Sequence, residues 1–139
     1  MKTLVSIVLF CIMLDASEIA IANNISGQVM AQKGSQSVSL KNGSSLEGEM
    51  IISTKENSSV TIIFKDHSEV VLGSNALLNL EKFVFKPIEK EYDFQLFLEK
   101  GSLAFESGKI GELAPEAFVF KTPDGTVAIR GTKFFIKLQ

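Results

Sequence analysis

The chain has 139 residues, of which 22% are charged and 45% hydrophobic, and its net charge at neutral pH is −2. This length suits a single domain, and the lack of a basic excess argues against a nucleic-acid-binding protein. With one Cys and one His, the sequence can form neither an internal disulfide nor a multi-histidine metal site. Phe is common, with 11 residues against one Tyr, which favours a packed core over a polar recognition surface.

Residues 1–22 are typical of a secretory signal peptide. Lys2 gives a positive start, Leu4–Leu14 is an apolar run of 11 residues, and Ala20–Ala22 has the small-x-small pattern of a cleavage site. The apolar run is shorter than the roughly 20 residues that a bilayer-spanning helix needs. We therefore expect cleavage near Ala22 and a periplasmic or secreted product.

Cleavage there would leave a domain of 117 residues, 23–139. This product loses its only Cys, and its net charge rises from −2 to −1 because one Lys and two carboxylates are removed. It must therefore be stable without disulfides, and we expect it not to span the membrane. An uncleaved N-terminal anchor and lipidation at Cys11 are the alternatives, although bulky Phe10 precedes this Cys where a small residue is typical.

Apolar residues alternate with polar ones in several windows, which predicts β-strands. The clearest windows are 59–65, 92–98, 118–121 and 133–138. No window of a dozen residues has a helical period, although 111–117 has room for one helical turn. The predicted fold class is all-β.

Tight-turn sequences separate these apolar runs. Lys41–Gly43 and Pro123–Gly125 contain Asn-Gly and Asp-Gly, which favour β-hairpin turns. Lys65–His67 is a similar turn in which His67 replaces glycine, and Lys86–Glu91 is the expected exposed loop. Short strands with frequent glycine predict stacked hairpins, arranged either as a β-sandwich or as a β-solenoid-like domain.

Several segments together resemble the FecR domain. They include Phe64–Gly73, Lys100-Gly101 and, most specifically, the closing segment Thr122–Phe134, which reads TPDGTVAIRGTKF. The resemblance extends from about Gly27 to Ile136. The residues that match the family motifs, for which we expect structural roles, are Asp66, Gly73, Gly101, Pro123, Gly125, Arg130, Gly131, Thr132 and Phe134.

The resemblance implies a periplasmic domain of the cell envelope. The best-known family members carry iron-uptake signals from an outer-membrane receptor to an anti-sigma region in the cytoplasm. This sequence shows no N-terminal cytoplasmic region and no receptor-docking module. We therefore expect a stand-alone exported module without a direct anti-sigma role. Family members usually continue with further strands after the closing motif, so either this module is minimal or an edge strand is open to a partner.

Arg130 is the motif residue with the clearest alternative roles. It lies in an apolar run, and a buried Arg must be paired. It either binds a ligand carboxylate or sugar, or it bonds backbone carbonyls or a carboxylate such as Asp66; we favour the structural role. Gly131 and Thr132 are expected to form a bulge or close approach, and His67 is interpreted as an exposed turn residue.

Two pairs of carboxylates and two Phe residues complete the candidate sites. Glu47 with Glu49, and Asp66 with Glu69, have the spacing of acid–base pairs, but we expect them on solvated faces because no nucleophile or cleft signature accompanies them. Phe97 and Phe135 fall on the polar faces of their strands. They mark either an exposed partner surface or a second buried face.

The motifs of catalysis are missing from the sequence: it has no phosphate loop, nucleophile elbow, Cys/His ligand set or basic-aromatic strip. We therefore expect no cofactor, no metal and no enzymatic activity; an enzyme acting on glycans is the least favoured reading. The favoured function is a non-enzymatic binding or interaction module of the periplasm that contacts a protein or an envelope glycan. The alternative is a sensory or regulatory component of envelope signalling that acts with a separate membrane partner. The oligomeric state stays open.

Overall fold

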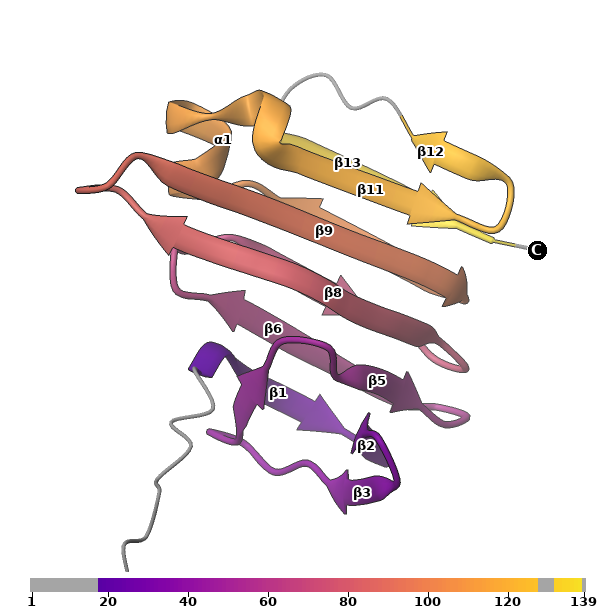
Figure 1. Ribbon diagram of the computed structural model, residues 1–139. Helices are drawn as coiled ribbons and strands as arrows, with labels where there is room; N and C mark the ends of the chain where they lie inside the picture. Colours follow the sequence, from indigo (N-terminus) through magenta and orange to yellow (C-terminus); the bar gives the residue numbers. More distant parts are fainter. Residues whose placement is uncertain (1–17, 128–131, 139) are drawn as a thin grey trace, which may run out of the picture.

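The computed structural model describes residues 18–127 and 132–138, which form two facing β-sheets (Figure 1). The all-β prediction is confirmed, and of the two predicted arrangements the sandwich is the observed one. Sheet A has six strands in the spatial order β13 (Lys133–Lys137), β10 (Ser102–Glu106), β7 (Glu69–Leu72), β6 (Ser59–Phe64), β1 (Glu18–Ser26) and β4 (Ser45–Glu47). Sheet B has seven strands in the order β12 (Gly125–Val127), β11 (Phe118–Thr122), β9 (Glu91–Lys100), β8 (Leu77–Lys86), β5 (Ile51–Thr54), β2 (Val29–Lys33) and β3 (Gln36–Ser39).

The predicted turns have two different uses in this fold. The turns after β6 and β11 each close an antiparallel hairpin, as predicted. The Lys86–Glu91 segment, which was expected to be an exposed loop, also closes an antiparallel hairpin, between β8 and β9. The Lys41–Gly43 turn instead joins β3 of sheet B to β4 of sheet A, so the hairpin predicted there is wrong. The reason is that β4 pairs with β1, which places Leu46 in the core at 0% exposure.

Two short helices close one end of the sandwich. They are α1 (Lys109–Leu113) and the 3-10 helix η1 (Pro115–Ala117), and they include the predicted helical turn. They connect β10 of sheet A to β11 of sheet B (Figure 1). Because of this connection, β11 runs parallel to β9, whereas the other strand pairs among the described residues are antiparallel.

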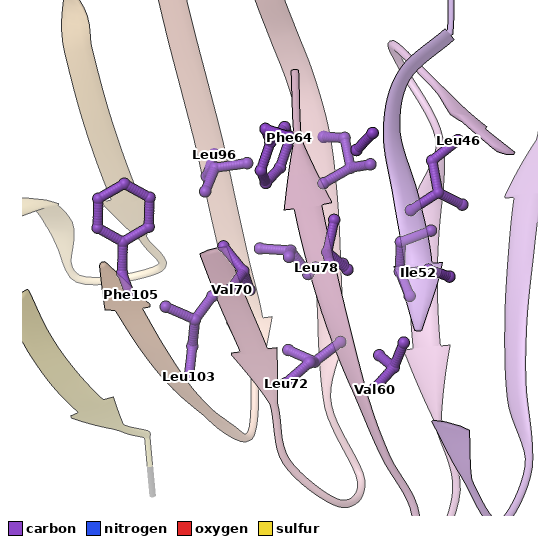
Figure 2. Packing of buried hydrophobic residues seen from close by; sticks show 14 of the residues in the cluster. Leu46, Ile52, Val60, Phe64, Val70, Leu72, Leu78, Leu96, Leu103 and Phe105 are labelled. Carbon is purple, nitrogen blue, oxygen red and sulfur yellow. The ribbon is translucent and has the colours of Figure 1, made fainter. Parts of the chain in front are cut away.

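The core lies between the inner faces of the two sheets. In β6 the buried residues are Val60, Ile62 and Phe64, which alternate with less buried neighbours as the sequence pattern predicted. Figure 2 shows such side chains from both sheets gathered between the strands, among them Leu72 and Leu103 of sheet A and Leu78 and Leu96 of sheet B.

Seven of the 11 Phe residues form one connected aromatic cluster in this core. Its members come from both sheets and are Phe64, Phe83, Phe94, Phe105, Phe118, Phe120 and Phe134. Phe94 lies at its centre, with ring centroids 4.7 Å from Phe64 and 5.0 Å from Phe118. Such contacts add about 0.5–1.5 kcal/mol per pair to the hydrophobic effect, so the cluster couples the two sheets.

Phe94→Ala should lower the free energy of unfolding by about 3–5 kcal/mol, because it empties the centre of the aromatic cluster. The matched control is Phe97→Ala, on the same strand but on the outer face, where we expect a loss of about 1 kcal/mol. Urea unfolding measures both values. Equal losses in the two variants would contradict the assignment of faces in β9.

Candidate functional site

The Asp66 carboxylate is fully buried, at 0% exposure, in the turn between β6 and β7. It accepts hydrogen bonds from the Ser68 backbone N–H at 3.0 Å, the Ser68 hydroxyl at 2.7 Å and the Ile110 backbone N–H at 3.0 Å. A carboxylate tolerates burial when strong donors of this kind surround it. The expectation that Asp66 lies with Glu69 on a solvated face is therefore wrong for Asp66, although Glu69 is exposed.

The same turn binds three consecutive backbone N–H groups at the start of α1. The Gly108 N–H donates to the Ser68 hydroxyl at 2.8 Å, and the Lys109 N–H donates to the Asp66 carbonyl at 2.7 Å. The Ile110 N–H completes the set by donating to the Asp66 carboxylate. The first N–H groups of a helix have no partner within it, and here the acceptors of residues 66 and 68 satisfy the N–H groups of residues 108–110. We call segments 66–68 and 108–110 together the clasp.

The two segments of the clasp lie so close together that position 108 has no room for a side chain. A Cβ atom at this position would collide with the Asp66 carbonyl oxygen and the Ser68 nitrogen, both of which are backbone atoms. Ser68 and Gly108 were not among the site residues predicted from the sequence. The only available signals were the Asp-x-Ser spacing and a glycine just beyond the end of a predicted strand.

Two motif glycines lie at the other end of the sandwich, where the chain crosses between sheets. The Gly73 N–H donates to the Ser102 carbonyl at 2.9 Å, and its own carbonyl accepts from the Thr54 hydroxyl at 2.5 Å. Gly101 has φ +91°, and a Cβ there would lie 2.7 Å from the Ala76 Cα. Both positions therefore hold crossovers that are packed closely against neighbouring chain.

The closing motif also lies in turns and in the core. Pro123 lies in the β11–β12 turn and Gly125 begins β12, and both residues are exposed. The Thr122 hydroxyl donates to the Gly125 carbonyl at 3.3 Å across this turn. The Thr132 carbonyl accepts from the Ser107 N–H at 2.8 Å, which joins the start of β13 to the chain beside the clasp. Phe134 points inward and stacks on Phe105 at 5.2 Å.

Arg130 and Gly131 lie outside the described residues, and the expected pairing of Arg130 with Asp66 lies outside them too.

The remaining polar candidates form no catalytic arrangement. Glu47 ends β4 and forms an ion pair with Lys33 at 2.9 Å, whereas Glu49 lies in the next turn with φ +67°. Residues two apart on one strand share a face, but Glu49 lies beyond the end of β4, so these two carboxylates do not lie on one strand face. His67 is an exposed turn residue with φ +70°, as interpreted from the sequence. Within 18–127 and 132–138, no group of three or more His, Cys, Asp and Glu residues could hold a metal ion.

Phe97 and Phe135 lie on opposite outer faces of the sandwich. Phe97 is half-buried on the outer face of sheet B, between Asn79 of β8 and Lys121 of β11. Phe135 is on the outer face of sheet A and is 68% exposed. The two rings therefore do not belong to one surface, and Phe135 is by far the more accessible.

Phe135 lies at the end of an apolar row across three strands. Val71, Ala104 and Phe135 are direct neighbours in the register of β7, β10 and β13. They line a shallow groove of about 400 Å³, whose other residues include Glu69, Glu106 and Lys133. We call these six residues the Phe135 surface.

The fold and the clasp define a small β-sandwich module whose motif residues hold its turns and crossovers. The family described as FecR protein matches residues 50–139, well over half of the chain, and the chain therefore belongs to this family. The resemblance seen in the sequence is thus confirmed, and the family is a regulatory one of envelope signalling. The match begins just before β5, so β1–β4 precede it.

Neither the curated proteins nor the solved structures give a match to this chain. Across the described ranges, no helix is long and apolar enough to cross a membrane.

Asp66→Ala should lower the free energy of unfolding by about 3 kcal/mol, because it leaves the buried N–H groups of Ser68 and Ile110 without their acceptor. Asp124→Ala, at an exposed turn position, is the matched control and should change it by less than about 0.5 kcal/mol. Thermal and urea unfolding give the comparison. A loss no greater for Asp66 than for Asp124 would show that the clasp adds no stability.

Gly108→Ala should cost about 1–3 kcal/mol, because the added methyl group displaces backbone at the clasp. Gly48→Ala introduces the same methyl group where no atom lies within 4 Å and should be nearly neutral. Amide hydrogen exchange at Ile110 should accelerate in the Gly108 variant alone. Unchanged protection there would contradict the close approach.

Proposed function

We propose that this chain is a non-enzymatic, exported module that regulates envelope signalling by binding another protein along β13. The observation that carries the proposal is the exposed Phe135 ring on a strand at the edge of sheet A. Membership of the FecR family supports the regulatory part of the proposal. The partner would be a separate protein of the envelope or its membrane.

The edge of β13 supports binding by strand addition. One side of β13 pairs with β10, and among the described residues no strand lies on its other side. Alternate backbone N–H and C=O groups on such an edge are free to bind an extended segment. Phe135 adds an apolar anchor beside those backbone groups, which is the kind of side chain that dominates binding energy at interfaces.

The charges on β13 favour a particular kind of partner. Lys133 and Lys137 share the outer face with Phe135, one on each side of it. Lys133 lies 3.6 Å from Glu106, whereas Lys137 is opposite Ser102. Because opposite charges on directly paired strands attract, the fitting segment alternates acidic, apolar and acidic side chains on this face.

The same charges disfavour self-association along this edge. If β13 paired antiparallel with β13 of a second copy, centred on Phe135, each Lys133 would face a Lys137. Like charges directly opposite one another destabilise a strand pair. The proposed occupant is therefore a different protein and not a second copy of this chain.

A photocrosslinking amino acid at position 135 should capture one envelope protein in native cells, through a segment with the acidic–apolar–acidic pattern. The same amino acid at position 97, on the opposite outer face, is the matched control and should capture none. Mass spectrometry of the crosslinked peptide identifies both the partner and the segment. A crosslinked product whose added mass is removed by glycan hydrolases would instead favour an envelope glycan.

The double variant Lys133→Glu, Lys137→Glu should reduce this crosslink at least tenfold, because it reverses the charges that face the acidic segment. The double variant Lys41→Glu, Lys55→Glu makes the same change in net charge at exposed positions elsewhere and should leave the yield unchanged. An equal loss in both double variants would show a non-specific charge effect and would refute the edge as the binding site.

A further inference from the structure

The first half of β1 lies inside sheet A, although residues 18–22 belong to the predicted signal peptide. β1 begins at Glu18 and lies between β4 and β6, with a neighbouring strand on each side. Every register pair between β1 and β4 uses a residue that precedes Asn23: Glu18, Ala20 or Ile21. Without residues 18–22, β4 would therefore lose the strand that it pairs with.

The same residues contribute to the core. Ile19, Ala20 and Ala22 are 6%, 1% and 0% exposed. Their backbone is also engaged: the Ile19 carbonyl accepts from the Lys65 N–H at 3.1 Å. The Ala22 N–H donates to Ser44 at 2.9 Å, and the Ala22 carbonyl accepts from Gly43 at 2.8 Å.

We infer that the leader is removed by a cut upstream of Glu18, so that Glu18–Ala22 remain in the exported domain. This inference rests on the export part of the proposed function. A cut after Ala22 would expose Leu46 and Phe64, which are 0% and 2% exposed and belong to strands that β1 pairs with. It would also leave unpaired backbone groups on β4 and β6, which is costly beside a core.

The small-x-small pattern at Ala20–Ala22 has another physical origin. Residues two apart on a strand share a face, and both alanines are buried against the core. Small side chains there leave room for larger residues such as Leu46 and Phe64 from the adjacent strands. A cleavage signal and a pair of inward strand positions therefore share the same two-residue period.

The test is the N-terminal residue of the full chain after export from a bacterial host, read by intact mass and N-terminal sequencing. We expect a product that has lost Met1 and still contains Glu18. A product that begins at Asn23 would overturn the inference and leave the proposed export intact. An uncut chain that remains in the cytoplasm would overturn both.

Ala22→Leu in the full chain gives a readout that does not depend on folding, because a bulky residue blocks cleavage at its own position. We expect the same leader to be removed as from the unmodified chain. Ala22→Ser, which keeps a small residue, is the control. Accumulation of uncut chain in the Leu variant alone would place the cut at Ala22 and refute the inference.

Discussion

Three N–H groups at the start of α1 lack partners within the helix, and the β6–β7 turn supplies one for each. This constraint organises the C-terminal half of the domain. With α1 held against the turn, the chain returns to sheet B as β11, parallel to β9. The bond from Ser107 to Thr132 fixes the start of β13 in the same region. The buried Asp66 thus positions strands that it does not touch, including the one whose edge we propose as the binding site.

The aromatic cluster explains why Phe135 points outward. Phe134 packs against Phe105, Phe118 and Phe120 in the core, and neighbouring residues on a strand face opposite sides. Alternation requires only that residue 135 face outward, and a polar side chain would satisfy it. A large apolar ring beside a sheet edge favours association, and the proposed binding role therefore accounts for Phe at position 135.

The inner faces of the strands could be predicted from sequence, because a two-residue period is visible directly in segments such as Val60–Phe64. The sheet that each strand joins could not be predicted, because an Asn-Gly turn such as Asn42-Gly43 can either close a hairpin or lead from one sheet to the other. The clasp could not be predicted either, since Asp66 and Ile110 are 44 residues apart and no local pattern relates them. The role of Ala20–Ala22 was ambiguous because an exported leader and a buried strand present the same spacing.

The order of the strands has a consequence for how the domain is made. In both sheets the N-terminal strands lie on one side and the C-terminal strands on the other, so the colours in Figure 1 progress across the sandwich. Each strand pairs mainly with strands a few elements away, which resembles the neighbour-to-neighbour growth of repeat proteins. The sandwich can therefore assemble directionally as the chain emerges, with β13 docking last. The surface that carries Phe135 is then complete only when all the rest has folded, so a truncated chain would not display it.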